Sequence, residues 1–220
     1  MPGISINAEL KTLCPNLRLG CIEANVVVAS SGQGLLSEIK ERLKLIQQSL
    51  LIVDISKISA IEVSRKAYKA CGKDPARYRL SAEALLRRVV SGKGLYLINN
   101  VVDQLNLVSV TSGFSIGGYD ADKIQGDISF GIGHADEPYT GIGRGELNIE
   151  NLPVFRDQAG AFGTPTSDSK RTEVGSDTNK FLMILIDFGR FDQLETSKQM
   201  AVRLLIDYCQ ATHINEYNID

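Results

Sequence analysis

The chain has 220 residues, 43% of them apolar, and a formal net charge of −2. This length fits one large domain or two small ones. No stretch reaches the roughly 18 apolar residues that a membrane-spanning helix needs, and the N-terminal sequence MPGISINAELK lacks the basic and apolar regions of a secretory signal. We therefore expect a cytoplasmic protein that does not enter the membrane.

The four cysteines form no CxxC pair and have no histidine at zinc-binding spacing. Reduced and mostly buried thiols are the favoured interpretation, ahead of a disulfide or a metal role. We expect no metal site and no cofactor. The cysteines are Cys14, Cys21, Cys71 and Cys209.

The N-terminal third of the chain predicts one strand and two helices. In CIEANVVVAS, β-branched residues between turn-forming ends predict a strand over residues 21–30. Leucines and isoleucines at helical spacing predict a helix over residues 34–50. A second helix is expected over residues 58–71, with Gly72 as its C-terminal stop.

Two further helices are expected in the middle of the chain. Ser81 is the predicted N-cap of the helix in AEALLRRVV, and Gly92 lies beyond its end. An apolar stripe that follows Asn99 and Asn100 predicts another helix, which ends at Gly113.

The pattern changes after Asp120. Residues 128–188 are short strand candidates separated by glycines, and KFLMILIDFG within them reads as a buried central strand. Residues 194–211 predict a closing amphipathic helix. This mixed order predicts an α+β fold with a mixed or antiparallel sheet core and flanking helices. No repeat or linker appears, so we predict a single domain over residues 1–220.

Positive charge gathers in residues 65–93, which carry +7 and leave −9 for the rest of the chain. A phosphate-rich partner would select such a cluster, and a solvated helical face would show the same charges. Within it, GKDPARYR places arginines beside a tyrosine, which suits RNA; a linker stopped by proline, with its tyrosine packed inward, is the alternative. The candidate RNA-binding residues are Lys73, Arg77, Arg79, Arg87 and Arg88.

Glycine spacings in GIGHADEPYTGIGRG, residues 131–145, resemble those of phosphate loops. The segment lacks the strand, glycine loop and helix order of a dinucleotide site, and no GKS or GKT follows. Turns between strands are the better explanation. His134 with Asp136 and Glu137 could touch a metal, but the chain has one other histidine, so a surface turn is favoured.

Hydroxyl side chains crowd the segment GTPTSDSKRT, residues 163–172, around Asp168, Lys170 and Arg171. Such a loop can bind ribose hydroxyls and phosphate through side-chain and backbone donors. It can equally be a series of Ser, Thr and Asp turns that satisfy their own backbone.

The segment INNVVDQLNLVSVTSGFSIGGYDADKI resembles the centre of the editing domain of the bacterial phenylalanyl-tRNA synthetase beta subunit, the B-three/B-four module. The resemblance covers about residues 70–190, with looser echoes at Gly163 and Thr178. The matching positions are Ile98, Asn99, Asn100, Val101, Val102, Asp103, Asn106, Gly113, Asp120, Ala121, Asp122, Lys123 and Ile124.

The resemblance implies a free-standing editing module without an aminoacylation site. The family domain hydrolyses the ester of tyrosine wrongly attached to phenylalanine tRNA, so the implied partner is an aminoacylated tRNA 3′ end. Leu105, Gly117 and Ile184 stand where the family pattern has threonine, histidine and glutamate, which implies altered specificity or a non-catalytic module that binds RNA or an amino-acid-like ligand. Asn99, Asn100, Asp103 and Asp120 are expected to brace the fold. The candidate pocket residues are Leu105, Gly117, Gly118, Tyr119, Thr166, Ser167, Asp168 and Arg171.

Overall fold

The computed structural model describes residues 3–220, whose ten strands form two four-stranded sheets and a two-stranded ribbon. The strands are β1 (Ile4–Ile6), β2 (Arg18–Asn25), β3 (Ser115–Asp120), β4 (Ile128–Ile132), β5 (Thr140–Gly141), β6 (Gly145–Glu146), β7 (Pro153–Asp157), β8 (Gly160–Gly163), β9 (Lys180–Asp187) and β10 (Thr212–Ile219). One sheet has the order β10–β2–β9–β3 and is antiparallel throughout. The other has the order β1–β4–β7–β8 and begins with a parallel pair.

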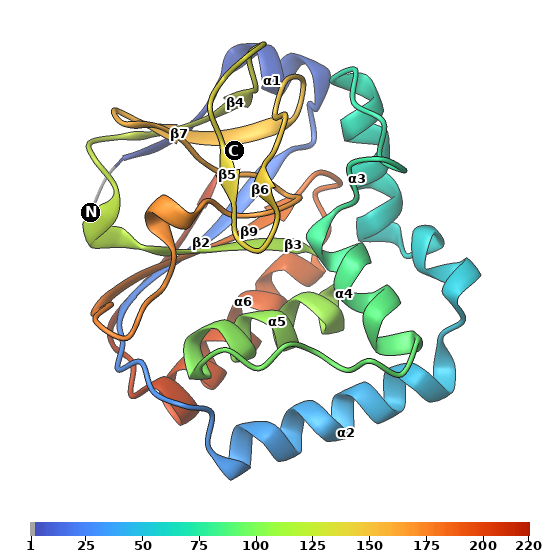
Figure 1. Cartoon of the computed structure of the whole chain (residues 1–220), viewed down its shortest axis with the longest axis vertical. Helices are drawn as coiled ribbons and strands as arrows, with labels where there is room; N and C mark the ends of the chain where they lie inside the picture. Colours follow the sequence, from blue (N-terminus) through green and yellow to red (C-terminus); the bar gives the residue numbers. More distant parts are fainter. Residues whose placement is uncertain (1–2) are drawn as a thin grey trace.

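Helices cover the antiparallel sheet on one side. The α-helices are α1 (Ala8–Leu13), α2 (Gln33–Ser49), α3 (Ser59–Ala70), α4 (Ser81–Val90), α5 (Asn100–Ser112) and α6 (Gln193–Cys209). Short 3₁₀ turns are η1 (Ile52–Lys57), η2 (Ala121–Lys123) and η3 (Lys170–Thr172). In Figure 1, α5 and α6 lie under the sheet and α2 runs below them, while the second sheet lies above. The fold class is therefore α+β, as the sequence predicts.

The buried side chains form three clusters that follow these layers. One joins the antiparallel sheet to α5 and α6 through residues such as Met183, Leu105 and Leu204. A second fills the space between the two sheets and contains Tyr119 and Ile184. The third packs α3 and α4 beside the second sheet. Because the two faces of a strand alternate, β3 and β9 each serve the first two clusters at once.

Most of the predicted elements are confirmed. The helices over 34–50, 58–71 and 194–211 and the central strand at 180–189 all occur, with ends shifted by one or two residues. Gly72 and Gly113 end their helices with φ of 87° and 80°, in the left-handed region that favours glycine. All four cysteines are buried and free.

Two local predictions are wrong. The strand predicted over residues 21–30 is β2, which covers Arg18–Asn25, because the chain turns away from β9 at Val27, whose amide donates to the Cys209 carbonyl. The N-cap of α4 is Leu80, with Ser81 as the first helical residue and no side-chain cap.

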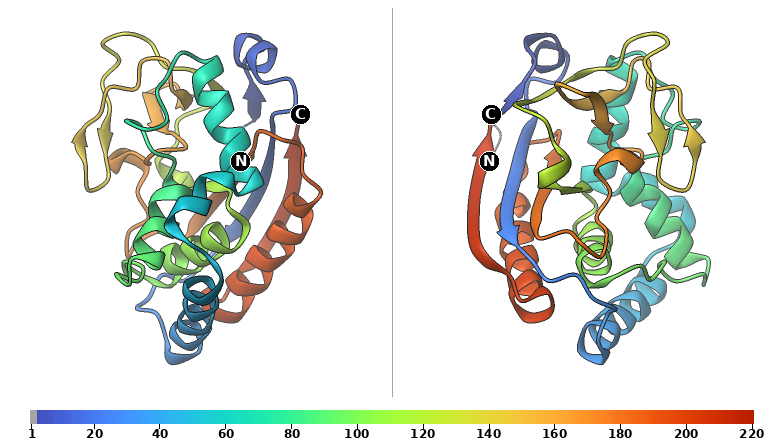
Figure 2. Two further views of the ribbon diagram at one scale, coloured as in Figure 1. Left: turned by 90° about the vertical axis from the view of Figure 1, so that its right-hand side faces the viewer. Right: turned by 60° about the vertical axis from the view of Figure 1, so that its left-hand side comes forward.

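The C-terminal strand β10 is absent from the sequence prediction. It pairs with β2 and forms the edge of the antiparallel sheet, as Figure 2 shows. Within residues 3–220 no helix is long and apolar enough to cross a membrane. The same residues hold no group of three or more His, Cys, Asp or Glu placed to bind a metal.

The family-like polar residues at the start of α5 brace the fold, as expected. Asn99 caps the helix by accepting from the Val102 amide at 2.9 Å. The buried Asn100 side chain donates to the carbonyls of Val27 and Tyr208 and accepts from the Ala29 amide. These bonds connect the β2–α2 loop, α5 and the end of α6.

Two acidic residues hold neighbouring turns in the same way. Asp103 accepts from the Ile98 amide at 2.8 Å and from the Ser31 hydroxyl at 2.5 Å. Asp120 accepts from the Asp122 amide and from the Thr178 hydroxyl, which lies 2.7 Å away. The turn after β3 is therefore fastened to the segment that leads into β9.

Replacing Asn100 by alanine should lower the free energy of unfolding by roughly 2 kcal/mol or more, because three partly buried main-chain groups lose their side-chain partner. The Asn99→Ala variant, which loses one cap, should lose only about 1 kcal/mol. Urea denaturation of both variants measures the difference. Equal losses would contradict the bridging role.

Candidate functional site

The predicted pocket residues on β3 and α5 are packed against protein on both faces of the strand. A Cβ at Gly117 would lie 2.0 Å from the Tyr119 hydroxyl, and one at Gly163 would lie 2.1 Å from the same atom. On the other face, a Cβ at Gly118 would lie 2.5 Å from Leu105 Cδ1. The two glycines of β3 therefore make room for side chains of this chain itself.

The Tyr119 ring is fully buried and packs edge-on against Phe162, with ring centroids 4.9 Å apart. Its hydroxyl lies close to Asp168, yet within residues 3–220 neither the hydroxyl nor Asp168 Oδ1 has a hydrogen bond of acceptable geometry. Burial and the nearby Asp168 carboxyl raise the pKa of Tyr119 well above its usual value. The phenol is therefore a neutral space-filling group.

Asp168 is a partly buried residue whose Oδ1 atom is covered by protein. Its Oδ2 accepts from the Gly118 amide at 3.2 Å. Burial raises the pKa of Asp168 to about 7, against the opposing effect of this hydrogen bond. The carboxyl links the hydroxyl loop (residues 163–172) to β3, and it changes charge near neutral pH.

The hydroxyl loop uses many of its own side chains to satisfy its backbone. Thr164 Oγ1 accepts from the Thr166 and Ser167 amides and donates to the Ser167 carbonyl. The Tyr139 hydroxyl donates to the same carbonyl at 2.6 Å, and the Tyr68 hydroxyl bonds Thr166 Oγ1 at 2.8 Å. Thr164 therefore satisfies the backbone of its own turn, which is one of the two functions expected for this loop. The Thr166 hydroxyl is hydrogen-bonded to the buried Tyr68.

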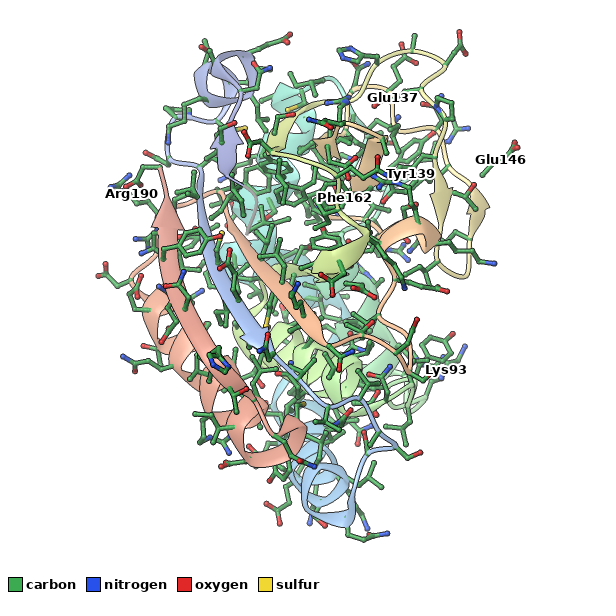
Figure 3. The ribbon with its side chains drawn as sticks, turned by 90° about the vertical axis from the view of Figure 1, so that its left-hand side faces the viewer. Lys93, Glu137, Tyr139, Glu146, Phe162 and Arg190 are labelled. Carbon is green, nitrogen blue, oxygen red and sulfur yellow. The ribbon has the colours of Figure 1, made fainter. Side chains whose placement is uncertain are left out.

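An open pocket of about 480 Å³ lies at the outer side of this loop. Three segments meet there: the turn before β5, the β7–β8 turn with the start of β8, and the residues at η3. Figure 3 shows Tyr139 and Phe162 near one another in this region, with Glu137 above them. The lining residues are Glu137, Pro138, Tyr139, Thr140, Ala159, Gly160, Ala161, Ser169, Lys170 and Arg171.

Some charged side chains of the pocket form ion pairs within the chain, and one does not. Arg171 binds Asp157 through two bonds of 2.8 and 3.0 Å. Burial would raise the pKa of Glu137, but bonds from Arg156 and the His134 amide hold it below its ordinary value. Lys170 is exposed and has no ion pair within residues 3–220. The pocket thus offers one free cation and one stabilised carboxylate.

Of the eight predicted pocket residues, Arg171 alone lines this pocket. Thr166, Ser167 and Asp168 lie in the loop directly behind it, and Asp168 joins them to Gly118. Leu105, Gly117, Gly118 and Tyr119 are in the interior. As ligand-binding residues they remain predictions, and the structure shows what they touch within the chain.

The basic segment serves partly to neutralise one buried carboxylate. Glu83, only 1% exposed, receives Arg65 at 2.8 Å and Arg87 at 3.0 Å, with Arg79 at 3.8 Å. Pairing explains why three arginines surround a residue in the first turn of α4, since an isolated buried charge is costly. The structural interpretation therefore holds for these three arginines, and phosphate binding by the cluster stays a prediction.

Lys73 is buried, and burial lowers its pKa. Its ammonium bonds the carbonyls of Asn148 and Glu150 and lies 3.9 Å from the Tyr78 ring centroid. Lys73 is therefore not part of the exposed cationic surface. Arg77 and Arg88 have no carboxylate partner within residues 3–220, and both lie over tyrosine rings.

The three positions where the chain departs from the family pattern are filled by apolar packing. Leu105 is 8% exposed in the cluster under the sheet, and Ile184 is fully buried between the sheets. At Gly117 the absent side chain is replaced in space by the Tyr119 phenol. None of the three residues has a polar side chain of its own.

The fold has a counterpart among solved structures. It is similar to the crystal structure of an N-terminal fragment of the phenylalanyl-tRNA synthetase beta subunit from Pyrococcus horikoshii, with a TM-score of 0.50 and 14% sequence identity. The match covers 98% of this chain and 53% of that one, so the chain spans about half the length of the solved fragment. At this identity the likeness concerns the fold.

A family model for the B3/4 domain matches residues 63–210. The chain belongs to the B3/4 domain family. This range is wider at both ends than the resemblance over residues 70–190. No curated protein matches the chain significantly in sequence.

Sequence reasoning missed most of the pocket lining. The turn interpretation of residues 131–145 is correct, since Glu137 accepts from the His134 amide and Asp136 has a φ of 57°. The same turn also forms a wall of the pocket. The signal that could have found it is Tyr139, an aromatic residue in a glycine-rich segment that otherwise has little apolar bulk.

The Gly117→Ala variant should lose roughly 3 kcal/mol of unfolding free energy, because the added methyl group overlaps the Tyr119 hydroxyl and ring in a tightly packed core. Gly32→Ala is the control, since its Cβ would meet nothing within 4 Å. Thermal and urea denaturation measure both. A Gly117→Ala protein as stable as Gly32→Ala would refute this packing.

The Asp168→Asn variant should flatten the dependence of stability on pH. The folded protein holds the Asp168 proton up to about pH 7, whereas the unfolded chain releases it near pH 3.8. The contribution of Asp168 to the free energy of unfolding is therefore complete below about pH 4 and is lost as the pH rises to about 7. At about 1.4 kcal/mol per pKa unit the loss is at most roughly 4 kcal/mol.

The measurement is urea denaturation at several pH values between 4 and 8. Asp136→Asn is the matched control, because this exposed residue stays in water and already has the positive φ that asparagine tolerates. An unchanged pH slope in Asp168→Asn would show that Asp168 is not the group responsible.

Proposed function

We propose that this chain is a stand-alone editing domain, which binds the aminoacylated 3′ end of a tRNA and hydrolyses the ester of an incorrect amino acid. The family membership supports a synthetase-derived domain. The single observation that carries the proposal is the pocket of about 480 Å³ against the hydroxyl loop, with Lys170 exposed at its edge. Its size is within the range of small-ligand pockets.

In this proposal the terminal nucleotide lies against the hydroxyl loop. Lys170 contacts a phosphate as a point charge, and Arg171 forms a fixed wall because Asp157 holds its guanidinium. Thr166, Ser167 and Asp168 set the shape of the loop from behind. The exposed cations Arg77 and Arg79, with the half-exposed Arg87 and Arg88, attract the rest of the RNA.

The specificity proposed here differs from tyrosine. The region beneath Gly117 and Gly163, where the family resemblance implies a polar pocket, already contains the phenol of Tyr119. A second tyrosine ring has no room there. The bound amino acid therefore extends into the open pocket, where Tyr139 and Ala161 supply apolar surface and Thr140 a hydroxyl group.

Hydrolysis in such a site depends mainly on positioning. The ester is already activated, so holding it and a water molecule in an attacking geometry supplies much of the rate. Glu137 is a weak base, since Arg156 and the His134 amide stabilise its charged form. Lys170 can stabilise the negative charge that develops on the ester oxygen.

A second function, binding without catalysis, is favoured by one observation. Where the family pattern has threonine, histidine and glutamate, this chain has Leu105, Gly117 and Ile184, none of which has a polar side chain. In that case the same pocket holds the tRNA end or an amino-acid-like ligand and leaves it intact.

The test is a deacylation assay with the full chain on a panel of tRNAs, each carrying a different incorrect amino acid. We expect one class of ester to be cleaved well above the buffer rate, and tyrosine not to belong to that class. Cleavage of none, together with retained tRNA binding, would select the non-catalytic function.

The variant Lys170→Ala should reduce the cleavage rate about ten-fold or more, because it removes the free cation of the pocket. Lys40→Ala, an exposed lysine on α2, is the matched control and should cleave at the unaltered rate. Equal rates in the two variants would contradict the assignment of the pocket.

A further inference from the structure

The connection between α4 and α5, residues 91–98, carries an unusual run of exposed apolar side chains. We call it the tyrosine loop. Tyr96 is 59% exposed, Leu97 59% and Ile98 63%. Gly92 and Gly94 both have positive φ, so the loop turns sharply before it presents these residues. In Figure 1 it runs from the end of α4 to the start of α5, above α2.

Between Glu83 and Asp103, which accepts from the Ile98 amide, the charged side chains are all positive. Residues 84–102 contain Arg87, Arg88 and Lys93 and no aspartate or glutamate. The Arg88 guanidinium lies over the Tyr96 ring, 3.7 Å from its centroid. Its Nε is buried and has no hydrogen-bond partner within residues 3–220, and Lys93 is exposed. The Arg88 guanidinium therefore has no anionic partner within residues 3–220, although one face of it is stacked on the Tyr96 ring.

We propose that the tyrosine loop binds an unpaired nucleobase of RNA, which stacks on Tyr96 while the adjoining phosphates contact Arg88 and Lys93. Aromatic rings beside free cations bind single-stranded RNA in this way, because every base has a flat face and every linkage a negative charge. The inference deepens the proposed function and rests on it for the choice of RNA as the partner.

The position of α4 connects this site to the pocket side of the molecule. The Ser81 amide at the start of the helix donates to the Pro165 carbonyl of the hydroxyl loop at 2.8 Å. The tyrosine loop follows the other end of the same ten-residue helix, about 15 Å away. Figure 3 places Lys93 on the same side of the view as Tyr139, farther down. An unpaired RNA end that enters the pocket can therefore pass along α4 to Tyr96.

A lipid surface also attracts cations and apolar side chains. The stacked pair of Arg88 and Tyr96 favours a planar ligand, because the ring is fixed in orientation by the guanidinium on one of its faces. Flat stacking on an aromatic ring is a property of nucleobases that lipid headgroups lack.

The experiment titrates the full chain with unfractionated tRNA and with a short single-stranded RNA that contains the fluorescent base 2-aminopurine. We expect Tyr96→Ala to weaken binding of the short RNA about ten-fold or more and to abolish the change in 2-aminopurine fluorescence. Tyr96→Phe keeps the ring and should bind within two-fold of the unaltered chain. Arg88→Gln should weaken binding and reduce its dependence on salt concentration.

Two controls test whether a loss of RNA binding comes from unfolding or from a membrane-binding role. Thermal denaturation of Tyr96→Ala should match the unaltered chain, because the side chain is mostly exposed. Equal RNA binding by Tyr96→Ala and Tyr96→Phe would overturn the proposal, as would loss of binding to anionic phosphatidylserine vesicles in Tyr96→Ala without any change in RNA binding.

Direct binding also separates this inference from the proposed function. If the chain binds RNA through Tyr96 but cleaves no ester, the stacking site stands and the hydrolase proposal fails. If it cleaves esters while Tyr96→Ala binds RNA as the unaltered chain does, the hydrolase proposal stands and the stacking site fails.

Discussion

The Tyr119 ring, enclosed between the two sheets, is the constraint on which the central part of this molecule depends. Its hydroxyl occupies the space above both Gly117 and Gly163, so β3 and β8 can approach only because neither position carries a side chain. Phe155 and Phe162 enclose the ring from the second sheet. A tightly packed interior leaves little freedom at such a point, and the rest of the site is arranged around this ring.

Asp168 joins this packing to the hydroxyl loop. The loop crosses behind β3 and delivers a carboxyl to the Gly118 amide, where burial keeps its proton up to about pH 7. The same loop then turns outward, so Lys170 and Arg171 emerge at the open pocket. Interior packing and the candidate binding surface are thus two sides of one ten-residue segment.

The basic cluster shows why charge in a sequence does not define a surface. Lys73 is buried against two carbonyls, and three arginines neutralise Glu83, a carboxylate that α4 turns inward. Within residues 3–220, the exposed cations of this segment without a carboxylate partner are Lys69 on α3, Arg77 before α4 and Lys93 after it. The electrostatic attraction proposed for RNA therefore comes from fewer residues than the sequence count.

The sequence by itself determined the α+β class, most helices, the central strand and the bracing roles of Asn99, Asn100, Asp103 and Asp120, because helical spacing, capping and turn chemistry are local. It also placed a motif of the B3/4 family around Gly117. Only the tertiary structure decided that Tyr119 fills the space at this glycine, that residues 131–145 form a wall of the pocket, and that three arginines form ion pairs with Glu83. It also decided the pairing of β10 with β2. Each of these depends on residues far apart in the chain, and local periodicity carries no information about which distant side chain arrives at a given point.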